Sequence, residues 1–78
     1  MNKNQRKKLA DILEVIEGQI VELEEMAEEE QEKADNIPDN LNNSDRAIML
    51  MESADNLNEA VADLQNWVDE VRENFELY

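Results

Sequence analysis

A single proline at position 38 separates two long stretches in which apolar residues recur at alternating intervals of three and four. Such spacing places apolar side chains along one side of an α-helix, as in helices that pack lengthwise against each other. The second stretch keeps this spacing throughout, whereas Glu30 interrupts it in the first. The expected seam residues are Leu9, Leu13, Ile16, Ile20, Leu23, Ala27 and Ala34, followed by Ala47, Leu50, Ala54, Leu57, Val61, Leu64, Val68, Val71, Phe75 and Tyr78.

The two patterns predict two α-helices, over about residues 4–35 and 44–76, joined by a turn over residues 36–43. Pro38 should end the first helix, because proline lacks an amide donor and keeps the preceding residue out of helical conformation. Ser44 is the expected N-cap of the second helix, because its hydroxyl can accept a hydrogen bond from a free backbone amide.

The connection of about eight residues is short enough to fold the second helix back antiparallel to the first. Alanines flank the turn on both sides, so small residues would meet there while larger ones fill the open end. We therefore predict an all-α antiparallel two-helix hairpin with a coiled-coil-like seam, forming one domain over residues 1–78. Because so short a chain buries only about 60% of its unfolded surface, we also expect two hairpins to form a four-helix dimer.

Charge excludes several classes of function. The chain has 21 acidic and 7 basic residues, giving a net charge of -14. Nucleic acids and anionic membranes attract proteins through positive charge, so neither is an expected partner. A protein with a basic groove is an expected partner.

The residue types needed for catalysis are scarce. Cysteine and histidine are absent, which excludes disulfides, thiolate zinc sites and histidine acid–base chemistry. The hydroxyl side chains are Ser44, Ser53 and Tyr78, and none has an obvious base. Residues 35–45 lack the glycine of a calcium loop and have Ile37 where an oxygen ligand is required. We expect no enzyme activity, cofactor or metal.

The chain also lacks targeting features. Acidic residues follow its basic start closely, unlike the apolar core of a signal peptide, and no stretch approaches the roughly 20 apolar residues of a membrane span. We expect a cytoplasmic protein. High charge and few aromatic residues are typical of disorder, but disordered acidic tails lack such regular apolar spacing, so we expect a folded chain.

The densest charged segment lies in the first helix. Seven glutamates fall within residues 22–32, which is one charge per roughly 2.4 Å of helix axis. Duplex DNA carries one charge per about 1.7 Å, so this surface could occupy a groove built for nucleic acid. The alternative is a solvated face that keeps a small protein soluble. The residues predicted to bind a partner are Glu22, Glu25, Glu28, Glu29 and Glu32.

Apolar residues outside the seam form a second candidate surface. Ile12 and Met26 on the first helix and Trp67 on the second flank the same side of an antiparallel pair. Exposed apolar patches mark association sites, and methionine suits adaptable ones. We predict that Ile12, Met26, Met51 and Trp67 mediate homodimer formation. Ile48 and Met49, near the turn, would contact a different protein.

The turn carries a more specific signal. The run Asp35-Asn36-Ile37-Pro38-Asp39-Asn40-Leu41 is followed by Ser44 and Arg46 and by the series Ala54, Leu57, Ala60, Val61 and Leu64. This segment, about residues 35–65, resembles a group of short acidic proteins encoded by phages and prophages of Gram-positive bacteria. The resemblance implies a bacterial host cell and favours an inhibitor of a host defence or nucleic-acid enzyme that acts as a DNA mimic. The alternative is an oligomeric helical adaptor or structural module without mimicry.

Overall fold

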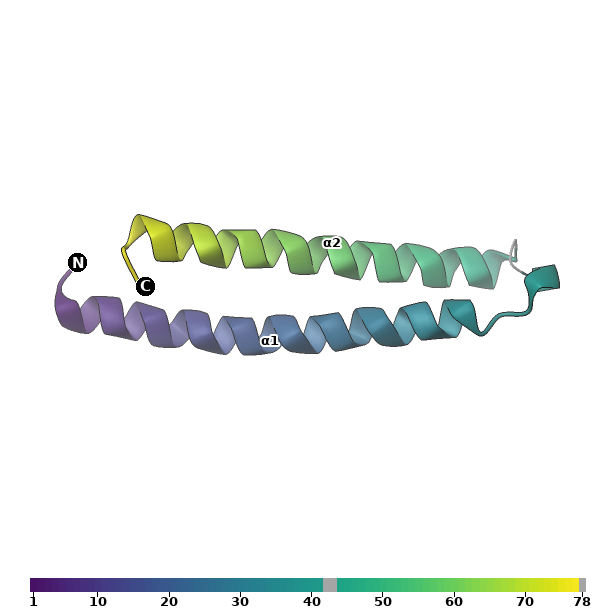
Figure 1. Ribbon diagram of the computed structural model, residues 1–78, viewed down its shortest axis with the longest axis horizontal. Coiled ribbons are helices and arrows are strands. Elements are labelled where there is room, and N and C mark those ends of the chain that lie inside the picture. The colour runs from purple at the N-terminus through teal and green to yellow at the C-terminus, as the bar shows by residue number, and fades with distance from the viewer. Residues whose placement is uncertain (42–43, 78) are drawn as a thin grey trace.

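The computed structural model describes residues 1–41 and 44–77, and these form an all-α hairpin. Helix α1 spans Lys3–Asp35 and helix α2 spans Asp45–Asn74, with a short 3-10 helix, η1, at Asp39–Leu41 between them. The helices run antiparallel along their whole length, so both termini lie at one end (Figure 1). The Cα atoms occupy a rod of 60 × 16 × 15 Å. The predicted fold class is confirmed, and each helix bound lies within two residues of its expected position.

The start of α1 is fixed by a reciprocal pair of hydrogen bonds. The Asn2 side chain accepts from the Gln5 backbone amide at 2.8 Å, and the Gln5 side chain accepts from the Asn2 backbone amide at 3.0 Å. This capping box satisfies two amides that a helix leaves without partners at its N-terminus. Sequence reasoning overlooked it, although the Asn-x-x-Gln spacing can be read directly.

The turn is closed by backbone hydrogen bonds that lead into a capped second helix. The Pro38 carbonyl accepts from the Leu41 amide at 2.8 Å, and the Leu41 carbonyl accepts from the Ser44 amide at 3.0 Å. Ser44 is the N-cap of α2, as predicted, and its hydroxyl accepts from the Ala47 amide at 3.2 Å. Asp45 lies in the first turn of α2, where a negative charge is favourable.

Burial between the helices follows one repeat of seven residues in each helix. The buried residues are Leu13, Ile20, Ala27 and Ala34 in α1 and Ala47, Ala54 and Val68 in α2. Together with Val61, which is partly buried at the same repeat, we call them the central row. A second repeat, in which Glu30 stands in place of an apolar seam residue, is the rim row, which is only partly buried or exposed: Leu9, Ile16, Leu23, Glu30, Leu50, Leu57, Leu64 and Val71.

The helix interface is therefore centred on one of the two predicted seam rows. Leu64, expected in the seam, remains 37% exposed at the rim, and Phe75 is also exposed. Tyr78, also expected in the seam, lies outside the described residues. Toward the open end, Leu13, Ile20 and Val68 form one apolar cluster. Leu13 and Val68 come from opposite ends of the chain, and their shared cluster agrees with the antiparallel arrangement of the helices.

Candidate protein-binding surfaces

The five glutamates predicted to bind a partner are all exposed on α1. Their spacing places them on the side of the helix opposite the seam. Among the described residues, the ion pairs are Lys33–Glu30 and Arg72–Glu17, so neither pair involves these five carboxylates. We call this surface the acidic face; its members are Glu22, Glu25, Glu28, Glu29 and Glu32.

Charge density restricts where the hairpin can resemble nucleic acid. The net charge of -14 along a rod of 60 Å is about one negative charge per 4.3 Å. That is less than half the density of duplex DNA, which carries one charge per about 1.7 Å. The five glutamates of the acidic face, within residues 22–32, give one charge per roughly 3.3 Å, which comes closer. Any phosphate-like surface is therefore the acidic face and its neighbours.

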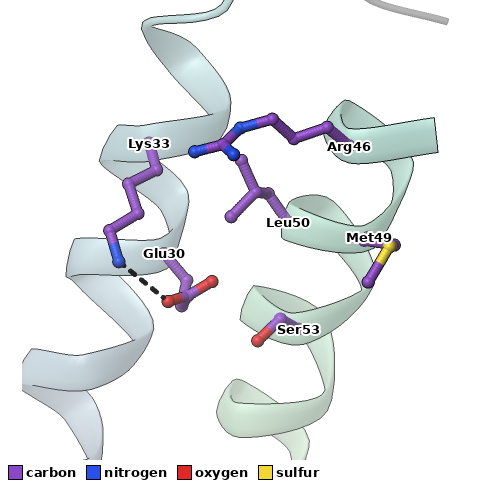
Figure 2. A pocket seen from close by; sticks show the side chains of 6 residues that line it. All are labelled: Glu30, Lys33, Arg46, Met49, Leu50 and Ser53. Carbon is purple, nitrogen blue, oxygen red and sulfur yellow. Dashed lines mark hydrogen bonds and ion pairs between the residues drawn. The ribbon is translucent and has the colours of Figure 1, made fainter. Parts of the chain in front are cut away.

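The two apolar residues predicted to contact a different protein, Ile48 and Met49, are both exposed near the turn. They are consecutive in α2, so their side chains leave the helix about 100° apart. Met49, which is 68% exposed, lines a groove of about 540 Å³ between the helices (Figure 2). Ile48 is not among the lining residues, which are Glu30, Lys33, Arg46, Met49, Leu50 and Ser53.

This groove, which we call the turn groove, mixes charge with apolar surface. Arg46 and Leu50 extend from α2 toward α1, and Lys33 bonds the carboxylate of Glu30 at 3.3 Å (Figure 2). Glu30 is the charged residue that interrupts the apolar spacing of α1, and its side chain is only 24% exposed. The pairing with Lys33 provides a partner for a carboxylate held at the edge of the helix interface.

The residues predicted to mediate self-association are exposed but do not share one surface. Ile12, Met26 and Trp67 lie on the long side of the hairpin that the rim row borders, which we call the rim side. Met51 is exposed on the opposite long side of α2. Val15, which sequence reasoning missed, is exposed three residues after Ile12 and leaves α1 in the same direction as Glu22 and Glu29, outside the rim side.

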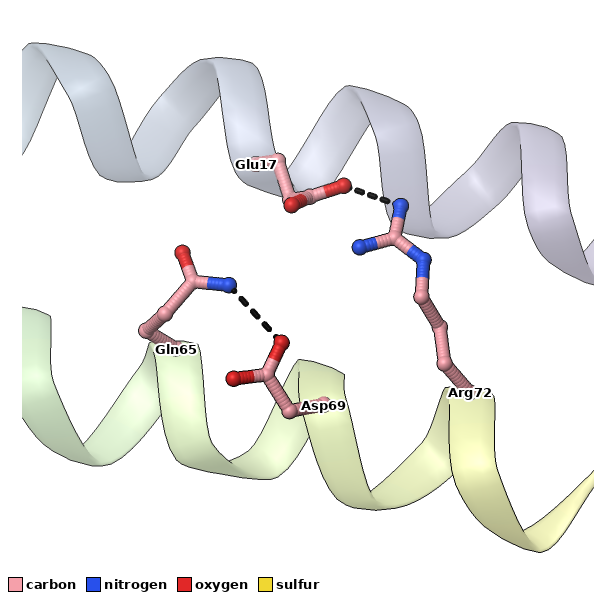
Figure 3. Close-up of polar contacts among 4 residues, drawn as sticks. All are labelled: Glu17, Gln65, Asp69 and Arg72. Carbon is pink, nitrogen blue, oxygen red and sulfur yellow. Dashed lines mark hydrogen bonds and ion pairs between the residues drawn. The ribbon is translucent and has the colours of Figure 1, made fainter. Parts of the chain in front are cut away.

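The opposite long side carries one polar contact between the helices and one within α2. Arg72 of α2 donates a hydrogen bond to the carboxylate of Glu17 of α1 and forms an ion pair with it, while Gln65 donates to Asp69 at 3.1 Å (Figure 3). The hydrogen bond from Arg72 lowers the pKa of Glu17, and its positive charge lowers it further, against the effect of burial. The same hydrogen bond raises the pKa of Arg72.

Other kinds of site lack support in the described residues. Neither α1 nor α2 has a stretch apolar enough to cross a membrane. Within residues 1–41 and 44–77, no group of three or more acidic side chains is placed to hold a metal ion. No family model matches the chain, and no curated protein or solved structure shows significant similarity to it.

Proposed function

We propose that this chain is a small protein-binding protein whose acidic face occupies a basic groove on a partner, its carboxylates standing in for phosphates. The observation that supports this proposal is the exposure of all five glutamates on one long helix, outside the described ion pairs. Opposite charges steer association and select partners. A helix also presents carboxylates at fixed intervals, which a flexible acidic tail does not.

Charge alone would give limited affinity, because an exposed ion pair contributes only about 0.2–1 kcal/mol. The proposed interface therefore includes apolar contacts near the turn. Met49 lines the turn groove beside Glu30, the residue that follows Glu29 of the acidic face. Ile48 would contact a different part of the partner, because it leaves α2 in another direction.

The partner class we propose is a host defence or nucleic-acid enzyme in the cytoplasm of a bacterial cell, which the chain would inhibit by competing with nucleic acid. The turn sequence motivates the bacterial and phage setting, and the charge density of residues 22–32 motivates competition with DNA.

The test is a variant in which the five glutamates of the acidic face become glutamine, which keeps helix propensity while removing charge. A partner is first captured from bacterial lysate and purified. Its affinity for the wild-type chain should fall steeply with salt, and duplex DNA should compete for binding. The variant should bind at least tenfold more weakly and show a shallower dependence on salt.

A matched control removes five exposed charges from α2 instead. It changes Glu52, Asp55, Glu59, Asp63 and Glu70 to their amides. This control should keep most of the affinity. Equal losses in both variants would point to general charge attraction rather than a specific acidic face. Unchanged binding by the first variant would contradict the proposal.

A helical adaptor without mimicry is the second candidate function, and the apolar rim side favours it. Under this alternative, partner affinity would depend on rim-side residues such as Ile12 and Met26. Binding would then vary little with salt, and duplex DNA would not compete.

A further inference from the structure

The rim side is an apolar surface that the hairpin itself does not cover. Because the interface is centred on the central row, the rim row lies at the edge of the helix pair, and apolar residues continue outward from it. The opposite side carries the Arg72–Glu17 contact instead. The exposed large apolar residues on the rim side are Ile12, Met26, Met49, Leu64 and Trp67.

The two ends of the rim side differ in shape. Trp67, nearly half exposed, lies toward the open end, whereas the turn groove lies at the other end. Ser53, which lines this groove, precedes Trp67 by 14 residues, so both side chains leave α2 in the same direction. The spacing corresponds to about 21 Å along the helix. One face thus presents a large aromatic side chain at one end and a groove at the other.

We propose that a second copy of the chain docks on the rim side with its long axis antiparallel. The twofold axis would cross the rod at Gln19 of α1 and Ala60 of α2. These positions are the midpoints between Ile12 and Met26 and between Ser53 and Trp67. Each Trp67 then reaches the turn groove of the other copy. In α1, each Ile12 lies opposite the partner's Met26.

Charge selects this orientation over the parallel one. Residues 21–59, the half toward the turn, carry 13 acidic and 2 basic residues, a net charge of -11. Residues 1–20 and 60–78, the open half, carry 8 acidic and 5 basic residues, a net charge of -3. Parallel rods would superimpose the two strongly negative halves, whereas antiparallel rods set each against the weakly charged half.

Shape leads to the same choice. In a parallel dimer, the turn groove of one copy would lie over the turn groove of the other, and each Trp67 would lie far from both. Lys33 would then lie opposite the partner's Arg46, two like charges. The antiparallel arrangement avoids this contact and gives both Trp67 side chains a groove to occupy.

The first test is the mass of the particle that the full chain forms in solution. Light scattering should give a dimer at micromolar concentration, and Trp67, the only tryptophan, should emit at shorter wavelength than at dilutions where the monomer predominates. Ser53→Arg, which fills the turn groove, should weaken the dimer at least tenfold. The matched control Asn58→Arg changes an exposed residue on the opposite side of α2 and should leave the dimer unchanged. Circular dichroism confirms that each variant is helical.

Crosslinking tests the orientation. The chain has no cysteine, so Ala60→Cys introduces a single thiol, which should form a disulfide with the same residue of the second copy. A mixture of Ala60→Cys and Gln19→Cys chains should crosslink like to like. Crosslinks between the two different variants would overturn the antiparallel orientation. A monomer mass with unshifted Trp67 emission would overturn the dimer.

Salt separates this inference from the proposed function. The dimer joins two negative chains, so screening by salt should tighten it, whereas binding of a basic partner should weaken with salt. An experiment can therefore find no dimer while the acidic face still binds a basic protein, or a dimer without such binding. The two results are distinguishable.

Discussion

The two halves of the hairpin hold their helices together with different side chains. Toward the turn, the buried residues are alanines, whereas Leu13, Ile20 and Val68 are buried toward the open end. Burying one methylene contributes about 0.8 kcal/mol, and fully burying a leucine, isoleucine or valine side chain contributes about 1.5–3 kcal/mol. The turn half therefore relies on the short connection and the Ser44 cap, while the open half relies on apolar burial.

This comparison shows how a two-helix chain can distribute its stability. Where the connection already holds the helices close, small side chains suffice. At the far end, where no connection exists, larger side chains must supply the attraction. The difference predicts that removing side-chain volume destabilises the open half, whereas adding side-chain volume destabilises the turn half.

The largest effect is expected from removing volume in the open half. Leu13→Ala should lower the free energy of unfolding by about 2–5 kcal/mol, because it removes buried methyl groups and leaves a cavity. Urea denaturation followed by circular dichroism measures the loss. Val21→Ala, an exposed change on the same helix, should stay within about 0.5 kcal/mol. Similar losses in the two variants would show that the open half does not depend on its buried apolar side chains.

Adding volume in the turn half should have a smaller effect. Ala54→Leu places a larger side chain where the native residue is fully buried, so overpacking should cost about 1–3 kcal/mol. Ala62→Leu, at an exposed position of α2, provides the control for helix propensity. Thermal unfolding compares the two. An Ala54→Leu variant as stable as the wild type would show that the turn half has unused space.

The smallest effect concerns the polar contact on the side opposite the rim. Arg72 lowers the pKa of Glu17 in the folded state, so the pair stabilises the fold above the ordinary glutamate pKa of 4.5. This stabilisation is lost as pH falls below 4.5 toward the lowered pKa. Glu17→Gln should therefore be less stable than wild type at pH 7, and the difference should shrink on acidification. Urea denaturation at pH 7 and at a pH below 4.5 measures the difference in the free energy of unfolding.

The corresponding control is Glu24→Gln, an exposed change on the same helix outside the described ion pairs. Its difference from the wild type should vary less with pH. A constant difference between wild type and Glu17→Gln across this pH range would contradict the assigned cause of the pKa shift.

The fold could be predicted because its determinants lie close together in the sequence. The spacing of apolar residues gave two helices, Pro38 gave the break, and Ser44 gave the cap. The preference for the central row could not be predicted from spacing, because both rows are apolar apart from Glu30 in the rim row, and the spacing treats them alike. Rotation of each helix about its axis depends on both helices packing together, as the exposure of Leu64 shows.

The candidate surfaces could be predicted only in part. Helical spacing placed the five glutamates on an outer face, and the structure shows them exposed. Met51 was predicted to share one surface with Trp67, but it follows Ala47 of the central row by four residues, which places it on the opposite long side of α2. The Arg72–Glu17 pair joins residues 55 positions apart, so predicting it required the register between the helices.

The location of the apolar cluster also bears on the order of folding events. Bringing Leu13 to Val68 closes a loop of 55 residues, whereas the buried alanines nearest the turn, Ala34 and Ala47, close one of 13. The longer closure costs only about 1.3 kcal/mol more in chain entropy. Complete burial of one leucine or valine side chain exceeds that difference. The contacts at the open end can therefore offset the extra entropy of closing their longer loop without help from the turn half.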